Sequence, residues 1–342
     1  MNGTLLVTSP RRQLTCRGMK PSVVVVGSYV QDLAWRCAEF PRAGETVVGS
    51  FVSGPGGKGS NQAVAAARAG AATCFIGAVG WDAFSRTARE FYRSEGIAAR
   101  FVGKPRHATA TAGILVNASG QNEIIVALGA SAQLRPRGVD PALIRGARVV
   151  VCQHEASLGV NAHVFRLARR AGVTTVLNPA PMRSDFDPAI LGLTDVLAPN
   201  ESELVALANR LRTGRGAPLS TAKLAALTPD ALQRHCRALG VATVIVTLGA
   251  RGCFVSQPDR FATIAGHRVR AVDTTGAGDG FVGGFAAGLV KFDGDIMPAA
   301  RFANAVGALS VTKPGTAPSM PRTREIARFL SRRRTAGRTG NF

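Results

Sequence analysis

Short apolar runs rich in β-branched residues recur along the chain, and helical patterns separate them. The run SVVVVGS at 22–28 is continuous rather than alternating, which is typical of a parallel strand buried on both faces. Segments 61–70 and 162–172 have helical spacing and end in a glycine suited to a helix C-terminus. This alternation predicts an α/β fold with a doubly wound, mostly parallel sheet flanked by helices. The further runs interpreted as strands are 72–79, 147–153, 173–178, 195–199 and 242–249.

Two other segments alternate in the manner of half-exposed strands. They span 44–54 and 108–128, and the second contains the hairpin turn signal NASGQN. We expect lid strands within about 33–56 and 100–128, forming a small antiparallel β sheet outside the main one. Because so small a sheet is not stable alone in water, it would cover a cleft or pair with a second subunit. The polar segment 208–228 is interpreted as a surface excursion.

Composition limits the class of protein. The 342 residues are 46% hydrophobic, which is enough to bury the core of a large α/β domain, and no apolar run reaches the roughly 18 residues of a membrane span. The net charge of +21 could suggest nucleic-acid binding, but residues 1–21 contribute +4 of it and residues 321–342 contribute +6. We therefore expect one domain over 22–330, a basic N-terminal extension over 1–21 and a basic tail over 331–342, with no nucleic-acid or membrane partner.

Cysteine usage points to a reducing compartment. None of the six cysteines forms a C-x-x-C pair, and several lie inside apolar runs. This pattern favours reduced thiols in a cytoplasmic protein over disulfides or a zinc site. The six are Cys16, Cys37, Cys74, Cys152, Cys236 and Cys253.

The stretch VDTTGAGDGFVGGFAAGL at 272–289 carries the clearest chemistry. Residues 267–275 are interpreted as a strand and 280–290 as a helix, so GAGD places glycine backbone at a helix N-terminus. Free N–H groups and the helix dipole make such a terminus an anion site, and glycine lets a phosphate approach closely. Asp279 could take a proton from an alcohol beside that site. The alternative is that Asp279 only caps the helix.

A second glycine cluster, GPGGKGSNQA at 54–63, matches G-x-G-x-x-G. It does not directly follow the first strand, as a dinucleotide fingerprint should, and Lys58 lacks the Ser or Thr that a Walker A loop requires next. We interpret it as a turn that brings backbone, Lys58 and Asn61 to a polyhydroxylated ligand. A tight turn before a helix would explain the glycines equally well.

Two further motifs follow predicted strands. APNESE at 198–203 places Asn200, Glu201 and Glu203 at a strand's carboxyl end, where ligands of such sheets bind. A helix capping box explains Asn200 and Glu203 equally well. VTLGARG at 246–252 is a strand followed by a glycine turn, suited to lying against a nucleotide.

Together the motifs resemble the ribokinase-like (PfkB) carbohydrate kinases over about residues 23–321. The matching stretches are GGKGSNQAVAAARAG, LNPAP, PNESE, TLGARG, DTTGAGDGFVGGF and KPGTAPSMP. The resemblance implies ATP-dependent phosphorylation of a sugar's primary alcohol. The leading candidate acceptor is the 5-hydroxyl of D-ribose. Deoxyribose, another sugar or a nucleoside stays open as the acceptor. A non-catalytic sugar- or nucleic-acid-binding regulator on this fold is a more remote alternative.

The resemblance also implies roles for single residues. Asp279 would be the catalytic base, beside an anion hole formed by Gly276, Ala277 and Gly278. Some family members have Asn where this chain has Val30, which leaves the sugar open. The implied sugar-binding residues are Val30, Asp32, Gly57, Lys58, Asn61, Glu155 and Asp279.

The remaining implied sites concern ATP, Mg²⁺ and K⁺. ATP would lie along Asn200, Thr247, Gly249, Gly252, Gly278 and Asn304. Glu203 would help to place Mg²⁺ and phosphate. The family's K⁺ site, formed mostly by backbone carbonyls, corresponds to Asp273, Thr275, Ser310, Lys313, Gly315 and Ser319. The lid would also pair two subunits, which implies a homodimer.

Overall fold

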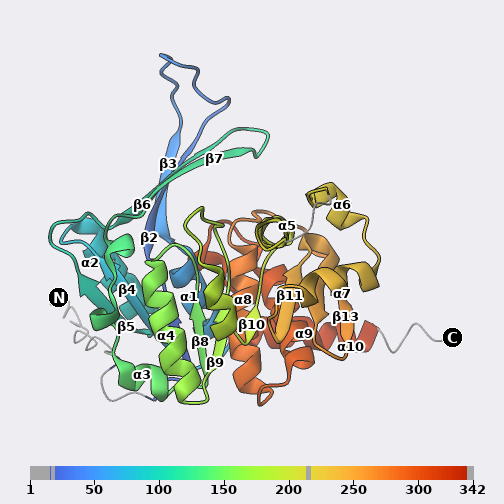
Figure 1. Ribbon diagram of the computed structural model, residues 1–342. Helices are drawn as coiled ribbons and strands as arrows, with labels where there is room; N and C mark the ends of the chain where they lie inside the picture. The colour runs from blue at the N-terminus through green and yellow to red at the C-terminus, as the bar shows by residue number, and fades with distance from the viewer. Residues whose placement is uncertain (1–15, 17–19, 213–216, 337–342) are drawn as a thin grey trace, which may run out of the picture.

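A nine-stranded sheet with helices on both faces forms the body of the molecule (Figure 1). The computed structural model describes Cys16 and residues 20–212 and 217–336. Every neighbouring pair of strands is parallel except those involving β12, which is antiparallel to β11 and to β13. In spatial order the strands are β13 (Phe261–Ala265), β12 (Gly252–Ser256), β11 (Thr243–Thr247), β10 (Val196–Leu197), β9 (Thr174–Leu177), β8 (Val149–Cys152), β1 (Val23–Val26), β4 (Thr73–Val79) and β5 (Ala98–Gly103).

Alternate residues of the buried strands belong to two separate cores. In β1, Val23 and Val25 pack on one face, and Val24 and Val26 pack on the other. The first face is covered by α1 (Lys58–Arg68), α2 (Ala83–Glu95), α8 (Ala277–Lys291), α9 (Ile296–Ser310) and α10 (Thr323–Ala336). The second is covered by α3 (Pro141–Arg145), α4 (Leu158–Arg170), α5 (Glu201–Arg210), α6 (Thr221–Ala225) and α7 (Pro229–Arg237).

Glycines inside α8 let this helix approach its neighbours closely. A Cβ on Gly283 would lie 2.3 Å from the carbonyl oxygen of Gln62 and 2.6 Å from Cβ of Ala65, both in α1. A Cβ on Gly284 would lie 2.7 Å from Val306 of α9. Larger side chains would push the helices apart, so these glycines bring the start of α8 close to the start of α1.

A four-stranded sheet projects from the body as the expected lid (Figure 1). The predicted antiparallel pairing is wrong in one place, because the two central strands, β2 and β6, run parallel. They continue from β1 and β5, which point the same way in the main sheet, so they leave the body in the same direction. β5 itself, which overlaps the predicted lid range, pairs with β4. In spatial order the lid strands are β3 (Ser50–Gly56), β2 (Val30–Arg36), β6 (Ala110–Val116) and β7 (Asn122–Ala127).

The predicted strand at 267–275 is wrong, because no strand covers that range. Its backbone is used in a loop instead. The N–H groups of Val272 and Asp273 donate to the carbonyl of Val311, and the Asp273 carboxylate accepts from the N–H of Thr275. These bonds tie the residues before α8 to those after α9, so they cannot join a sheet.

The cysteines differ in part from expectation. Cys16 and Cys74 form a disulfide, so the prediction of reduced thiols is wrong for this pair. The other four, Cys37, Cys152, Cys236 and Cys253, are free. The cytoplasmic location stays a prediction and now rests on those four alone. Within the described ranges, no helix has the length and apolar character to cross a bilayer.

Parts of the expected chain ends and surface excursion lie outside the described residues. These parts are 1–15, 17–19, 213–216 and 337–342. Helix α10 passes the expected domain boundary at 330 and continues to Ala336. Helix α6 lies within the segment interpreted as a surface excursion.

Candidate active site

Asp279 lies where the N-terminal ends of α8 and α1 meet. Gly276 precedes α8 with φ of 78°, a left-handed conformation that favours glycine, and Asp279 follows in the first turn with 6% of its surface exposed. Its two carboxylate oxygens accept from Asn61 Nδ2 and from Gln62 Nε2, each at 2.9 Å. Two side-chain amides from one helix therefore orient the carboxylate of another.

The backbone N–H groups at the start of α8 directly precede Asp279 in the sequence. The N–H of Ala277 donates to the carbonyl of Thr274 at 3.2 Å. No hydrogen bond within the described part of the chain uses the N–H of Gly276 or Gly278. A Cβ on Gly278 would meet no atom within 4 Å. The open amides for an anion are thus those of Gly276 and Gly278, whereas the Ala277 amide is engaged within the turn.

A chain of buried amides supports Gln62. Its Nε2 also lies 3.0 Å from Asn178 Oδ1, and its Oε1 accepts from Gln153 Nε2 at 2.7 Å. Asn178 in turn donates to the carbonyl of Ala198 at 2.9 Å. Sequence reasoning did not select these three side chains, although Gln62 lies beside Asn61 and Asn178 lies in LNPAP. Their mutual bonds fix the donor that holds Asp279.

Lys58 lies among three of the expected carboxylates. Burial by itself lowers the pKa of Lys58, but the charges of Asp279, Glu155 and Glu203 raise it further than burial lowers it. Glu155 accepts from Ser28 Oγ at 2.6 Å and from the N–H of Lys58 at 2.9 Å. Burial raises the pKa of Glu155 despite these partners. The glycine turn before α1 therefore brings a cation among several carboxylates.

Asp32 occupies the base of lid strand β2. Its Oδ2 accepts from Thr316 Oγ1 at 3.1 Å. Burial raises the pKa of Asp32 to about 7; the Thr316 hydrogen bond opposes this shift, and the charges of Glu155 and Asp279 add to it. Asp32, Glu155 and Asp279 are thus close enough to influence one another.

Val30 packs beneath the glycine turn. Gly57 has φ of 88°, and a Cβ there would lie 2.7 Å from the backbone nitrogen of Val30. Val30 is buried against Ala110 and Ala112 of β6. At this position the chain therefore offers an apolar side chain that cannot hydrogen-bond a sugar hydroxyl.

The expected nucleotide positions lie at the ends of neighbouring strands. Asn200 and Glu203 form a reciprocal capping box at the start of α5, as the alternative interpretation expected, and Asn200 pairs with Thr247 in a parallel bridge. Burial raises the pKa of Glu203. Gly249 has φ of 56°, and a Cβ there would meet no atom within 4 Å, so its backbone is open to a ligand.

Two nucleotide positions have a structural explanation as well. A Cβ on Gly252 would lie 2.0 Å from the carbonyl oxygen of Ile264, so glycine is required where β12 meets β13. Asn304 Nδ2 lies 3.3 Å from that same carbonyl oxygen and 3.4 Å from that of Ala265. Both residues therefore support the edge of the sheet.

Comparison with known proteins identifies the family. The family model for pfkB family carbohydrate kinases matches residues 20–323. The chain belongs to this family. It is 37% identical over 312 residues to the ribokinase of Mus musculus, covering 89% of this chain and 93% of that protein. It is 34% identical over 316 residues to the deoxyribokinase of Salmonella typhi, covering 90% and 98%.

Solved structures show the same fold. The structure of Arabidopsis thaliana ribokinase complexed with ribose and ATP has a TM-score of 0.80 and 29% sequence identity, covering 91% of this chain and 99% of that one. The protein is thus a PfkB carbohydrate kinase, a phosphotransferase with an alcohol acceptor, and its ribokinase-like fold carries a mixed four-stranded lid.

The expected cation positions of this PfkB kinase lie in two neighbouring loops. The carboxylate of Asp273 accepts from the N–H groups of Thr275 and Gly315, each at 2.9 Å. Burial raises the pKa of Asp273, but the hydrogen bonds outweigh it and leave the pKa lowered. Lys313 pairs with Glu325, so its ammonium is held by a carboxylate.

The two serines of this set use their hydroxyls locally. Ser310 Oγ donates to the carbonyl of Gly307, and Ser319 Oγ to that of Thr316, each at 2.8 Å. Their own carbonyls are the groups that the family resemblance assigns to a cation. In the described part of the chain, no group of three or more His, Cys, Asp or Glu side chains could hold a metal.

Proposed function

We propose that this PfkB kinase transfers the γ-phosphoryl group of ATP to the primary 5-hydroxyl of D-ribose, giving ribose 5-phosphate and ADP. The observation that carries the proposal is the Asp279 carboxylate, held by Asn61 and Gln62 beside the open backbone of Gly278. The similarity to mouse ribokinase and to an Arabidopsis ribokinase complexed with ribose and ATP supports ribose as the acceptor.

In the proposed reaction Asp279 takes the proton of the sugar hydroxyl. The hydroxyl oxygen forms a bond to the γ-phosphorus as the bond from that phosphorus to the ADP oxygen breaks. The amides of Gly276 and Gly278 would stabilise the transferring phosphoryl group. The ammonium of Lys58, which interacts with the charges of Asp279 and Glu155, would neutralise negative charge that collects there. The sugar would be held by Asp32, Gly57, Asn61 and Glu155.

Two ions belong to the proposal. Mg²⁺ is normally held by one or two carboxylates together with substrate phosphates. The family resemblance assigns Glu203 to this role. Each oxygen of its buried carboxylate accepts one hydrogen bond from Asn200 at the start of α5, so the ion would bind through the remaining lone pairs. Mg²⁺ would neutralise the triphosphate. K⁺ would lie against the carbonyls of the loops that Asp273 ties together, and ATP would lie along the open backbone of Gly249.

Deoxyribose is the second candidate acceptor, and Val30 is the observation that favours it. A buried apolar side chain offers no hydrogen-bond partner to a sugar hydroxyl. A sugar that lacks one hydroxyl would therefore lose less binding free energy here than at a site with a hydrogen-bonding side chain. The similarity to a Salmonella deoxyribokinase points the same way. A nucleoside acceptor has no specific observation in its favour.

The test is a coupled ADP assay with ribose, 2-deoxyribose, fructose and adenosine, in Mg²⁺ and K⁺. We expect the highest kcat/KM with ribose and no ADP once EDTA removes the Mg²⁺. A higher kcat/KM with deoxyribose would replace ribose by the second candidate. If no acceptor yields ADP and the protein instead associates with DNA in a salt-sensitive manner, the kinase proposal fails in favour of a regulator.

We also propose a homodimer formed through the lid. The lid strands expose large apolar side chains, among them Trp35 at 40% and Ile125 at 77%. Trp35 contacts Phe51 across β2 and β3, with ring centroids 5.0 Å apart. A contiguous exposed apolar surface on a sheet is typical of a protein interface. A second lid would cover this surface.

A further inference from the structure

The turn η5 (Ala317–Ser319) and the residues beside it connect the lid base to the body of the molecule. Thr316 Oγ1 lies 3.1 Å from Asp32 Oδ2 and 3.2 Å from the carbonyl oxygen of Pro55, in strands β2 and β3. One hydroxyl proton serves one acceptor at a time. The bond to the carboxylate is the stronger of the two when Asp32 is ionised. Thr316 therefore contacts both strands at the base of the lid.

The Asp32 carboxylate has few other restraints. A Cβ on Gly56 would lie 2.1 Å from Asp32 Oδ2, so Gly56 makes room for the carboxylate but gives it no hydrogen bond. Among the described residues, Thr316 makes the one hydrogen bond to this side chain, at Oδ2. Oδ1 is left for a ligand hydroxyl. The orientation of Asp32 thus depends on where Thr316 is held.

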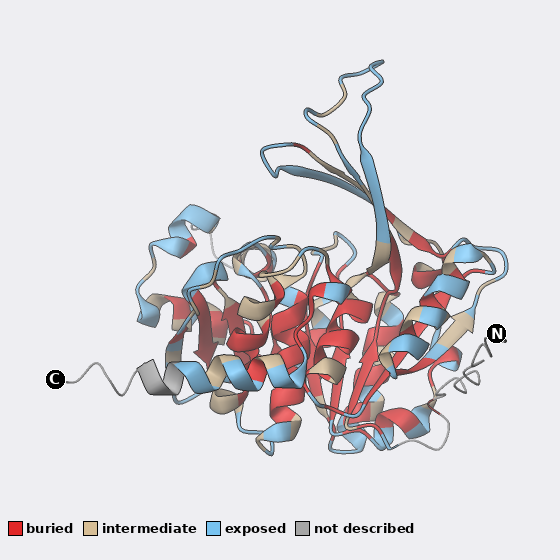
Figure 2. Ribbon diagram, turned by 180° about the vertical axis from the view of Figure 1, so that it is seen from behind, coloured by how far each residue is buried: buried red, intermediate tan, exposed pale blue. Residues whose placement is uncertain are grey.

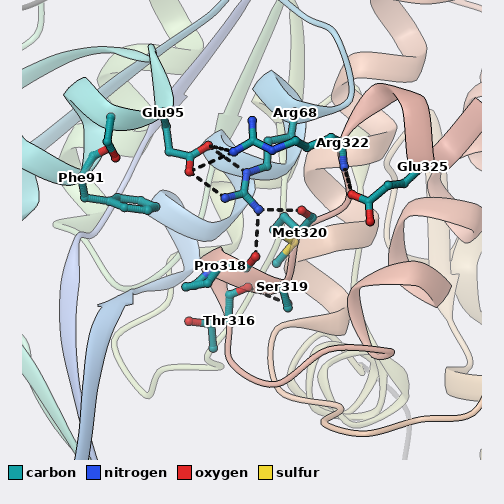
Figure 3. Close-up of polar contacts among 10 residues, drawn as sticks. Arg68, Phe91, Glu95, Thr316, Pro318, Ser319, Met320, Arg322 and Glu325 are labelled. Carbon is teal, nitrogen blue, oxygen red and sulfur yellow. Dashed lines mark hydrogen bonds and ion pairs between the residues drawn. The ribbon is translucent and has the colours of Figure 1, made fainter.

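Arg68, near the C-terminal end of α1, holds the turn that carries Thr316 (Figure 3). Its Nη1 donates to the carbonyls of Pro318 and Met320 at 2.9 and 2.7 Å. Its Nε and Nη2 donate to the two oxygens of Glu95 at 2.9 and 2.7 Å. The two side chains are only 10% and 9% exposed. One planar guanidinium with several donors makes these four bonds at once, which a lysine cannot do.

Hydrogen bonds connect the turn internally. Ser319 lies between the two carbonyls that Arg68 binds, and its Oγ donates to the carbonyl of Thr316 at 2.8 Å. Met320 packs against the start of α8, where a Cβ on Gly276 would lie 3.5 Å from its Cε. The contacts therefore run from Arg68, through the turn, to Thr316 and Asp32.

We propose that Thr316 is a positioning residue that orients the Asp32 carboxylate for a sugar hydroxyl, and that Arg68, paired with Glu95, holds Thr316 in place. The inference rests on the proposed role of Asp32 in sugar binding. It assigns to Thr316, which lies beside Gly276, and to Arg68 behind it an effect on the affinity for sugar, and not on phosphoryl transfer or ATP.

The test measures KM for ribose and for ATP, together with kcat, in Thr316→Val and Thr316→Ser. Valine keeps the shape and removes the hydroxyl. We expect it to raise the ribose KM about 3- to 10-fold, the size of one hydrogen bond, with the ATP KM and kcat nearly unchanged. Serine keeps the hydroxyl and should retain most of the wild-type ribose KM. An unchanged ribose KM in Thr316→Val would overturn the inference.

A double-mutant cycle tests whether Arg68 acts through Thr316. We expect Arg68→Lys to raise the ribose KM as well, and the double variant with Thr316→Val to be no worse than the more affected single variant. If the two effects multiply, Arg68 acts independently and that half of the inference fails. That half of the inference also fails if Arg68→Lys changes the ribose KM, the ATP KM and kcat by similar factors. Should Arg68→Lys not fold, Glu95→Gln takes its place in the cycle.

Arg148 provides the matched control. It also pairs with a carboxylate, that of Asp293, and donates to a carbonyl, that of Val290, but it is exposed and remote from the turn. Arg148→Ala should leave all three constants unchanged.

Calorimetric titration with ribose separates this inference from the proposed function. An inactive wild type that binds ribose, with binding weakened in Thr316→Val, would end the kinase proposal and keep the inference. A wild type that binds no pentose would overturn both.

Discussion

The two acidic ends of the candidate site are built differently. Asp279 is held by Asn61 and Gln62 in a junction of helices packed through glycine, and Gln62 has buried partners of its own. Asp32 lies on a lid strand, and among the described residues its side chain accepts a hydrogen bond from Thr316 alone. Helix α8 is buried from Asp279 to Leu289. Much of the projecting lid is exposed (Figure 2).

This difference corresponds to two physical demands. A proton-accepting group must be held within a fraction of an ångström of its reacting geometry, which favours a packed helix junction. A group that grips the sugar must also let it enter, which favours a movable lid that excludes water once closed. We infer that the Asp279 end is formed before substrate arrives and that the Asp32 end is completed on lid closure.

The largest expected effect is at the preformed end. Asp279→Asn should lower kcat by about 10²- to 10⁴-fold, because the amide cannot take the hydroxyl proton, while ATP affinity stays nearly intact. Steady-state kinetics and ATP titration measure the two quantities. The matched control is Asp293→Asn. Asp293 is an exposed aspartate in the loop between α8 and α9, and this variant should behave as wild type. Turnover near wild type in Asp279→Asn would remove the distinction between the two ends.

An intermediate effect is expected on the lid. Ile125→Glu places a charge on the exposed apolar face of β7, so two lids could pair only by burying unpaired carboxylates. We expect the dimer dissociation constant to rise about 10-fold to 100-fold, measured by analytical ultracentrifugation, and the ribose KM to rise with it.

Trp81→Glu serves as the control for the lid variant. Trp81 is also a large exposed apolar residue, but it lies outside the lid strands. This variant should assemble as wild type does. A wild-type protein that is monomeric at all concentrations would contradict the proposed lid interface.

The smallest effect concerns the loops tied by Asp273. If K⁺ binds there, K⁺ should stimulate turnover more than Na⁺ at equal ionic strength, because their carbonyls border the start of α8. Asp273→Asn should reduce that preference, since the amide replaces one of the two accepting oxygens by an NH₂ donor and so loses the bond to the N–H of either Thr275 or Gly315. Equal activity in K⁺, Na⁺ and tetramethylammonium would end the cation proposal.

Local patterns predicted the elements of the body well. The apolar runs at β1, β4, β8 and β11 and the glycine-ended helix α1 follow from short-range periodicity. The segment at 267–275 failed, because its apolar and polar alternation resembles a strand while its backbone bonds go to residues after α9. The prediction of reduced thiols failed for Cys16 and Cys74 for a similar reason, since the spacing of cysteines in the sequence does not tell which of them meet in the fold.

The sequence by itself determined the α/β class, the lid segments and the motifs around Lys58 and Asp279, because their signals lie within a few neighbouring residues. Only the tertiary structure decided that Gln62 holds Asp279, that β2 and β6 run parallel, and that Thr316 reaches Asp32 across 284 residues of chain. Those contacts depend on strand order and on how closely α1 packs against α8. No local stretch of sequence encodes such distances, since they result from the packing of the whole body.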